Sequence, residues 1–269
     1  MAVAQDAAGG LPWLKDGSGA KDMVYSSVGL CALTLNCAML DLTLIKAITL
    51  DLDDTLWPIW PAIERAEKAL DDWLSQHAPM TAALFANPAA RHEIREHVIR
   101  SRPEFKHNLS AIRREAIRLA LYRSRENPLL AEDAFAVFYA ERNRVTLFED
   151  ALLALEFLSS RFPLVALSNG NADIQRIGIS NYFRTSISAQ QFGVGKPDPR
   201  IFHAAAGSVE VAPAHVLHVG DDAALDVLGA LNCGMQTVWV NRTEHLWTHA
   251  GEPHETVTSL TELCDLFPR

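Results

Sequence analysis

The sequence predicts an α/β protein, a doubly wound parallel sheet that carries an inserted block of helices. From residue 150 onward, short apolar runs alternate with amphipathic segments, which is typical of repeated strand–helix units. Another buried strand is predicted much earlier, at Leu44–Leu50, and the stretch that follows it has only helical periodicity. The composition, 49% hydrophobic and 21% charged over 269 residues, is that of a globular protein with material for one or two domains.

The inserted block runs from Pro61 to about Thr146. Apolar residues recur there at steps of three and four, so each of its main segments is predicted to form an amphipathic helix. Pro-containing dipeptides separate the segments, as expected between helices. The four predicted helices are AIERAEKALDDWL, AARHEIREHVI, SAIRREAIRLALYR and AEDAFAVFYAERNRV. Four helices are enough for a small bundle with its own core.

The second half of the chain supplies the rest of the predicted sheet. The expected strands are PLVALS, TSISAQ, HVLHVG and MQTVWV, and the expected helices are ALLALEFLSSRF, NADIQRIGI, PRIFHAAAGSV and ALDVLGALNC. Residues 39–57 and 147–269 are therefore predicted to form the sheet domain, and residues 58–146 a helical cap. Residues 1–38 are rich in Ala, Gly and Ser and lack periodicity, so we interpret them as a leader or an over-long gene start before Met39.

Net charge and cysteine content limit the partners and the cellular compartment expected for this protein. With 24 Lys and Arg against 33 Asp and Glu, the net charge is −9, which argues against binding to nucleic acid. The apolar run Val28–Leu40 is too short to span a bilayer, so no membrane role is expected. The 4 cysteines are too scattered for a disulfide framework, and they favour a reduced, cytoplasmic setting. Either a monomer or a homodimer is expected.

Polar side chains follow the predicted strands where a ligand would bind. In open α/β sheets ligands bind beyond the carboxyl ends of the strands. At these ends stand Asp51-Leu52-Asp53-Asp54-Thr55, Ser168-Asn169-Gly170, Gly195-Lys196-Pro197 and Gly220-Asp221-Asp222, with Asp226 on the following helix. We expect the fold to bring several carboxylates, one hydroxyl and one ammonium group to one edge of the sheet.

Phosphoryl transfer is the chemistry that suits this set. Clustered carboxylates repel one another unless a cation lies among them, and oxygen ligands without His or Cys select Mg²⁺. One carboxylate can attack phosphorus to form an aspartyl-phosphate, while a second, two residues away, protonates the leaving alcohol and deprotonates water. Ser168 and Lys196 can hold phosphate oxygens. The amides of Asn169 and Gly170, expected at the start of a helix, would add donors.

The order Asp51-x-Asp53-x-Thr55, Ser168, Lys196 and Gly220-Asp221-x₄-Asp226 resembles the haloacid dehalogenase (HAD) superfamily of phosphohydrolases over residues 44–242. The resemblance implies a Rossmann-like core, a helical cap of type C1, and Asp51 as nucleophile with Asp53 as general acid/base. It also implies Mg²⁺ bound by the Asp51 carboxylate, the Asp53 backbone carbonyl and Asp221. Asp226 would support the site from behind, by orienting Lys196 or a metal-bound water.

Three segments resemble a narrower group within this superfamily. PLVALSNGNADIQRIGISNYF, GVGKPDPRIFHAA and VLHVGDDAALDVLGALNCGMQTVWVNR are similar to bacterial HAD phosphatases that act on flavin-type phosphates. Members of that group hydrolyse FMN and the 5-phosphoribitylamino-uracil intermediate of riboflavin synthesis. The resemblance therefore implies a small phosphorylated metabolite as the partner of the site.

Several alternatives remain open at this point. Trp57 and Trp60 follow the first motif, and they could wall the pocket against a flat ring or pack at the junction with the cap. Asp54 is expected to start a helix or to support the site residues, and Asp222 to start a helix or to bind the metal. His218 is expected in the core. Rival activities are a 2-haloacid dehalogenase, which needs neither Mg²⁺ nor Asp53, and a phosphomutase. A rival of another class is a non-catalytic binding protein on the same scaffold.

Overall fold

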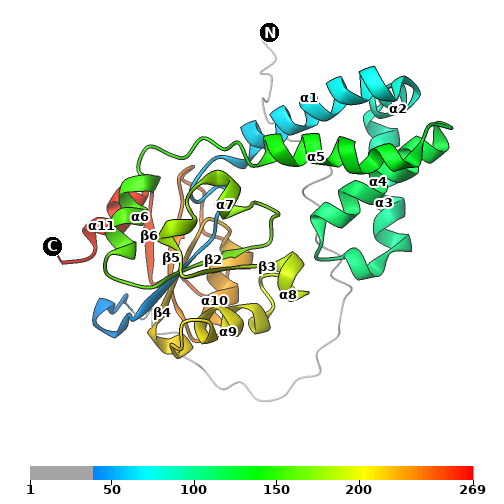
Figure 1. Cartoon of the computed structure of the whole chain (residues 1–269). Helices are drawn as coiled ribbons and strands as arrows, with labels where there is room; N and C mark the ends of the chain where they lie inside the picture. The colour runs from blue at the N-terminus through cyan, green and yellow to red at the C-terminus, as the bar shows by residue number, and fades with distance from the viewer. Residues whose placement is uncertain (1–38, 269) are drawn as a thin grey trace, which may run out of the picture. The chain divides into compact units, whose positions relative to one another are not determined.

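A parallel sheet of six strands forms the centre of the chain, in the order β3-β2-β1-β4-β5-β6 (Figure 1). The computed structural model describes residues 39–268, so the predicted leader at 1–38 lies outside the described residues. All neighbouring strands pair in parallel. The strands are β1 (Ala47–Leu50), β2 (Leu164–Ser168), β3 (Thr185–Ser188), β4 (Val216–Gly220), β5 (Gln236–Val240) and β6 (Glu255–Val257).

The two faces of the sheet bury different helices, because successive side chains of a strand point to opposite faces. Ile48 and Leu50 of β1 pack with α6 (Ala151–Ser159) and α11 (Leu260–Asp265). Ala47 packs on the other face, with α9 (Pro199–Gly207) and α10 (Gly229–Leu231). Figure 1 shows these two helical layers on either side of the strands. The apolar runs of the sequence thus form a sheet buried on both faces, as predicted.

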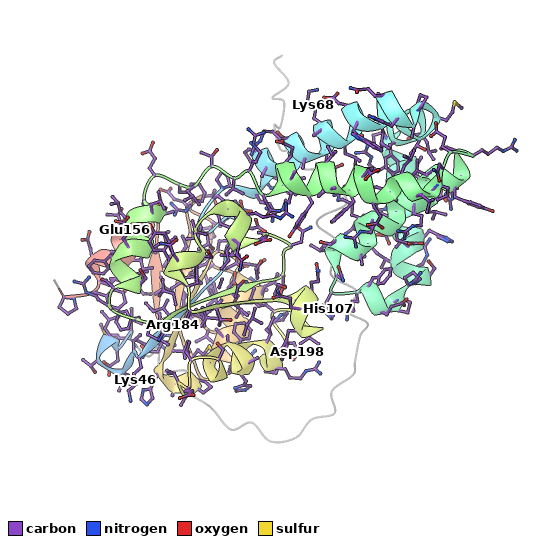
Figure 2. The ribbon with its side chains drawn as sticks, in the orientation of Figure 1. Lys46, Lys68, His107, Glu156, Arg184 and Asp198 are labelled. Atoms are coloured by element: carbon purple, nitrogen blue, oxygen red, sulfur yellow. The ribbon has the colours of Figure 1, made fainter. Side chains whose placement is uncertain are left out.

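The helical insertion lies between β1 and β2. Its helices are α1 (Ile59–His77), α2 (Pro79–Phe85), α3 (Pro88–Ser101), α4 (Leu109–Arg123) and α5 (Ala131–Arg142). Helix α1 buries Ala62, Ala66, Leu70 and Leu74 along one stripe, as its four-residue spacing predicts. Charged side chains such as Lys68 on α1 and Glu156 on α6 are exposed on the opposite faces of their helices (Figure 2).

Local capping explains several helix boundaries within the insertion. The Asn87 side chain accepts a hydrogen bond from the Ala89 N–H, and Pro88 occupies the first helical position of α3. The Asn108 side chain caps α4 in the same way, through the Ala111 N–H. The Asn87-Pro88 dipeptide, predicted to separate two helices, therefore lies at the start of α3.

Several predicted boundaries differ from the structure. Helix α2 was missed because Pro79 lies only two residues after the end of α1, and seven residues carry little periodicity. The predicted strand Leu44–Leu50 begins later, at Ala47, after a short 3₁₀ turn (Leu42–Leu44). The strand predicted to be the last, β5, has one more parallel neighbour, β6. None of the helices within residues 39–268 is long and apolar enough to cross a membrane.

Candidate active site

The site lies where the chain reverses its direction across the sheet. Strand β1 is paired with β2 on one side and with β4 on the other, so the connections run to opposite sides from β1. In open α/β sheets the crevice at such a switch point is where ligands bind. Asp51 directly follows β1 and Asp221 directly follows β4. The Asp51 N–H donates to the Val219 carbonyl at 2.9 Å, which holds the two strand ends together.

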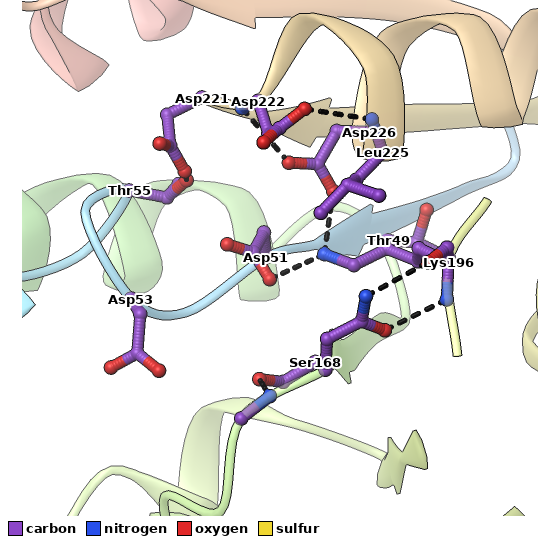
Figure 3. Close-up of polar contacts among 12 residues, drawn as sticks. Thr49, Asp51, Asp53, Thr55, Ser168, Lys196, Asp221, Asp222, Leu225 and Asp226 are labelled. Carbon is purple, nitrogen blue, oxygen red and sulfur yellow. Dashed lines mark hydrogen bonds and ion pairs between the residues drawn. The ribbon is translucent and has the colours of Figure 1, made fainter. Parts of the chain in front are cut away.

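Three carboxylates converge at this point. Asp51, Asp221 and Asp226 each offer an oxygen within 4.8 Å of the others (Figure 3). Asp226 reaches the cluster from a single turn of π-helix (Ala223–Leu228), and its side chain is 1% exposed. Gly220 is required beside it, because a Cβ there would overlap the Asp226 side chain. The sequence-predicted edge of carboxylates is therefore formed by residues from two strand ends and one helical turn.

Lys196 is the cation that faces this cluster. Its Nζ donates to Asp51 Oδ1 and, at 2.5 Å, to Asp226 Oδ1 (Figure 3). Burial alone would lower the pKa of Lys196, but Asp226 and Asp51 outweigh burial and raise it. Lys196 is therefore charged throughout the range of pH in which proteins are stable, and it links the nucleophile candidate Asp51 to Asp226.

The carboxylates titrate differently because their surroundings differ. Burial raises the pKa of Asp51 well above its ordinary value, and Asp226 and Asp221 raise it further against the opposing effect of Lys196. Burial, assisted by Asp226, raises the pKa of Asp221 to about 7. Burial also acts on Asp226, yet Lys196 and His218 bring its pKa down to about 2. One Lys196 charge thus faces three carboxylates, two of them buried, and such a surplus of negative charge favours a further cation.

His218 connects Asp226 to the interior of the sheet. Its Nε2 lies 3.0 Å from Asp226 Oδ1 and its Nδ1 lies 2.7 Å from the Thr49 hydroxyl. Burial lowers the pKa of His218, so the ring is neutral near pH 7. Since a carboxylate only accepts, the proton is assigned to Nε2, and Nδ1 accepts from Thr49. The sequence predicted a buried core residue here and missed this contact with the site.

Asn169 holds the segment that carries Lys196. Its Nδ2 donates to the Lys196 carbonyl at 2.8 Å, and its Oδ1 accepts from the Lys196 N–H at 2.7 Å. Gly195 allows this close approach, since a Cβ there would come within 2.5 Å of Asn169 Oδ1. The side chain of Asn169 therefore positions Lys196 across 27 residues of chain, a role that the prediction, which concerned the Asn169 backbone amide, did not include.

The Ser168–Gly170 turn differs from its prediction in one respect. Helix α7 begins at Ile174 with Asp173 as its cap, so the amides of Asn169 and Gly170 do not start a helix. The Gly170 N–H donates to Ser168 Oγ at 2.9 Å. Ser168 is 4% exposed, and its own hydroxyl proton remains a donor for an anion at the strand end. The Ser168 hydroxyl can thus still donate to a phosphate oxygen, whereas the Gly170 N–H is already bonded to Ser168 Oγ.

Asp53 does not join the carboxylate cluster. Its Oδ1 accepts from Trp57 Nε1 at 2.8 Å, and both of its oxygens lie 2.7 Å from Nη2 of Arg142. Arg142 was not identified from the sequence, where nothing distinguishes it from the other arginines of the helical block. The proposed metal contact through the Asp53 backbone carbonyl stays a prediction.

The aromatic pocket wall at Trp57 is a prediction that the structure corrects. Trp57 is fully buried, and its ring packs in the core of the sheet domain with Leu52 and Leu56. Its indole therefore offers no face to a ligand, and its one polar atom serves Asp53. Of the two interpretations of Trp57, packing at the junction is the one that agrees with the structure.

The remaining residues of the strand-end motifs shape the loops. Asp54 Oδ1 accepts from the Ile59 N–H at the start of α1, as expected. Asp222 Oδ1 accepts from the Ala224 and Leu225 N–H groups, which makes it the cap of the π-turn rather than a member of the cluster. The Thr55 hydroxyl donates to Asp221 Oδ1 at 3.1 Å and orients that carboxylate.

A parallel sheet with an aspartate cluster at its switch point, and with helices inserted after the first strand, defines a class of α/β hydrolytic enzymes. The family comparison agrees with this class. Residues 45–234 match the model of the haloacid dehalogenase-like hydrolases, so the chain belongs to that family.

Relatives of known activity include both phosphatases and dehalogenases. The chain is 32% identical over 235 residues to the 5-amino-6-(5-phospho-D-ribitylamino)uracil phosphatase YigB of Escherichia coli, covering 83% of this chain and 96% of the relative. It is 35% identical over 136 residues to a phosphoserine phosphatase of Thermus thermophilus, covering 48% of this chain and 55% of the relative. A 2-haloacid dehalogenase structure from Pseudomonas syringae pv. Tomato superposes with a TM-score of 0.79 and 36% identity, covering 82% and 97% of the two chains.

Proposed function

We propose that the protein is a Mg²⁺-dependent phosphomonoesterase that works through an aspartyl-phosphate on Asp51. The observation that carries this proposal is the convergence of Asp51, Asp221 and Asp226 on one point, with the Lys196 ammonium bonded to both Asp51 and Asp226. Such a site suits a substrate that brings its own negative charge together with a divalent cation.

The donor set fits Mg²⁺. Asp51 and Asp221 offer carboxylate oxygens, and no His or Cys belongs to the cluster within residues 39–268. Asp226 is already engaged by Lys196, His218 and the Asp222 N–H, so it supports the site from behind. When bound, Mg²⁺ would offset the charge on the phosphate oxygens and on the two carboxylates. The raised pKa values of Asp51 and Asp221 reflect the need for such a charge.

In the first step, a carboxylate oxygen of Asp51 attacks phosphorus and the bond from phosphorus to the ester oxygen breaks. Lys196 and the Ser168 hydroxyl hold the phosphate oxygens while their charge develops. Asp53 gives its proton to the leaving alcohol. Lys196 also orients the attacking carboxylate through its bond to Asp51 Oδ1.

In the second step, water attacks the aspartyl-phosphate and the bond between phosphorus and Asp51 breaks. Asp53, now a carboxylate, takes the proton of the attacking water, and inorganic phosphate leaves. The proton that Asp53 takes replaces the one given to the alcohol. The helical insertion would exclude bulk water during transfer and reopen for release.

For the substrate, we propose a phosphate ester of the flavin type, such as FMN or the phosphoribitylamino-uracil. The support is the similarity to YigB, which extends over 96% of that relative and therefore includes the helical insertion. The riboflavin-pathway phosphate is the substrate named for YigB, and its transfer to this chain is part of the proposal.

The test is a phosphate-release screen with Mg²⁺ over FMN, the phosphoribitylamino-uracil, sugar phosphates, nucleotides and phosphoglycolate. Flavin-type esters should give the highest kcat/KM, and a poor rank for them would reject the substrate while leaving the phosphatase. Asp51→Asn should abolish turnover, because the amide cannot form the phosphoenzyme. Phosphatase activity retained in Asp51→Asn would reject the covalent mechanism. Product analysis with a sugar monophosphate separates hydrolysis from phosphomutase activity.

Dehalogenation is the second candidate, and the Pseudomonas syringae structure favours it. That reaction displaces a halide at carbon, so it has no leaving oxygen to protonate and no phosphate charge to offset. Halide release from a 2-haloacid in the presence of a chelator would support it. We expect no such release, because the paired carboxylates Asp51 and Asp221 would then lack a partner cation.

A further inference from the structure

We propose that Arg142 is a positioning residue for Asp53, and that it holds the Asp53 carboxylate in the orientation needed for the second step, hydrolysis of the aspartyl-phosphate. This inference rests on the proposed phosphatase function. Arg142 is the last residue of α5 and lies 89 residues from Asp53 in the sequence. It belongs to none of the four strand-end motifs.

The pairing is buried and uses both carboxylate oxygens. The side chain of Arg142 is 1% exposed and that of Asp53 is 14% exposed. Nη2 of Arg142 lies 2.7 Å from each oxygen of Asp53. Contact with both oxygens fixes the rotation of the Asp53 carboxylate. A general base must be held within hydrogen-bond reach of the water whose proton it takes, so this orientation serves the second step.

The two oxygens of Asp53 are not equivalent. Oδ1 accepts from Trp57 as well as from Arg142, whereas Oδ2 accepts only from Arg142 within residues 39–268. Oδ2 also faces the Ser168–Gly170 turn, because a Cβ added to Gly170 would lie 2.5 Å from Oδ2 and 3.2 Å from Ser168 Oγ. The oxygen with spare acceptor capacity is therefore the one turned toward the group expected to hold phosphate.

The backbone around Arg142 is tied to the same turn region. Oδ1 of the next residue, Asn143, accepts from the Asp173 N–H at 2.7 Å. Asn143 also donates to the Tyr139 carbonyl at 2.8 Å, so it joins the end of α5 to the loop after β2. The end of α5 that carries Arg142 is thus anchored by the loop that follows Ser168, through Asn143 and Asp173.

A direct contact between Arg142 and the substrate is the competing role. Nη1 of Arg142 is buried and has no hydrogen-bond partner among the described residues, so it could serve an oxygen of a ligand. The two roles differ in the step they affect. A residue that acts through Asp53 as base affects breakdown of the phosphoenzyme, whereas a phosphate ligand affects its formation too.

The experiment uses the Mg²⁺-loaded enzyme and p-nitrophenyl phosphate, whose phenolate leaves without a proton. Arg142→Gln should lower kcat by roughly 10²-fold, the range of a general base, and leave kcat/KM within about threefold. A pre-steady-state burst should approach one p-nitrophenolate per active site, and the phosphoenzyme should be trapped by acid quench. Arg144→Gln is the matched control, because that side chain is 74% exposed and should show neither effect.

Two further variants keep the assignment falsifiable. Arg142→Lys serves if the glutamine variant fails to fold. It retains the positive charge without the planar guanidinium, so it should give an intermediate kcat and the same burst. On an Asp53→Asn background, Arg142→Gln should add no further loss of kcat, since both changes remove one function. An independent additional loss would overturn the assignment.

Three other outcomes would reject the assignment of Arg142. Parallel loss of kcat and kcat/KM without a burst would assign Arg142 to phosphate binding or to the fold, and would reject the base-positioning role. An unchanged kcat in Arg142→Gln would reject it as well. A wild-type enzyme that releases phosphate from no ester would reject the proposed function first, and this assignment with it.

Discussion

His218 Nε2 lies 3.0 Å from Asp226 Oδ1, in a buried contact that joins strand β4 to the helical turn after it. The same Asp226 oxygen accepts from Lys196, which in turn bonds to Asp51. His218, which the sequence places only in the core, is therefore linked to the proposed nucleophile Asp51 by a chain of three contacts.

Replacement of His218 by leucine should destabilise the protein and slow catalysis. Asp226 and Thr49 would each lose a buried partner, at a cost of about 1–3 kcal/mol in the free energy of unfolding. Urea denaturation measures the loss, and kcat should fall because Asp226 holds Lys196 less firmly. Thr49→Val is the control, since it leaves the bond between His218 and Asp226 in place. Full kcat in His218→Leu would show that the network is only structural.

Removal of Mg²⁺ should be visible in stability as well as in activity. A ligand that binds only the folded state raises the melting temperature by mass action. Mg²⁺ should therefore raise the Tm of the wild type, and Asp221→Asn should abolish the rise, because it removes one of the two proposed carboxylate ligands. Thermal melts with EDTA and with Mg²⁺ provide the measurement. An equal Tm rise in Asp221→Asn would place the cation elsewhere.

A methyl group at Gly170 should interfere with the site. The Cβ of alanine would lie 2.5 Å from Asp53 Oδ2 and 3.2 Å from Ser168 Oγ, so one of these side chains must move. We expect kcat/KM to fall by about 10-fold or more, since catalysis depends on placement within less than an ångström. Gly207→Ala is the matched control, because its Cβ would meet nothing within 4 Å. Equal activities of the two variants would contradict the close packing at Gly170.

Acid should weaken the junction of β5 and β6 through His254. Its Nδ1 lies 3.2 Å from the Thr237 N–H, and burial lowers its pKa from the ordinary 6.5. The unfolded chain then binds more protons than the folded one below about pH 6.5, so stability is lost as the pH falls through that window. Because His254 is half-buried, solvent screening keeps this effect on stability small.

The variant His254→Asn isolates this effect, since its amide oxygen can accept a hydrogen bond and does not titrate. Denaturation midpoints of the wild type and of His254→Asn, compared between about pH 5 and pH 7.5, should diverge only on the acid side. The other histidines cancel in the difference. If the two proteins lose stability equally at each pH, His254 does not contribute to the pH dependence.

The sequence was sufficient for the sheet and for the strand-end motifs. Strand periodicity located β2, β4 and β5 to within one residue at each end, because strands buried on both faces are continuous apolar runs. The parallel arrangement then implied that Asp51, Ser168, Lys196 and Asp221 lie at one edge. Short elements such as α2 and β6 escaped, since seven or three residues hold too little pattern.

What the sequence by itself determined is the chemistry available: an Asp-x-Asp motif after one strand, a serine after another, a lysine and two further aspartates. Only the tertiary structure decided which side chains pair. In the folded chain the Asp53 carboxylate accepts from Arg142 and Trp57. The Asn169 side chain bonds to the backbone of Lys196, and the His218 ring contacts the Asp226 carboxylate. These contacts join residues as many as 89 positions apart, and their partners are chosen by packing. Local sequence patterns report on neighbours within a few residues, so they carry no information about such pairings.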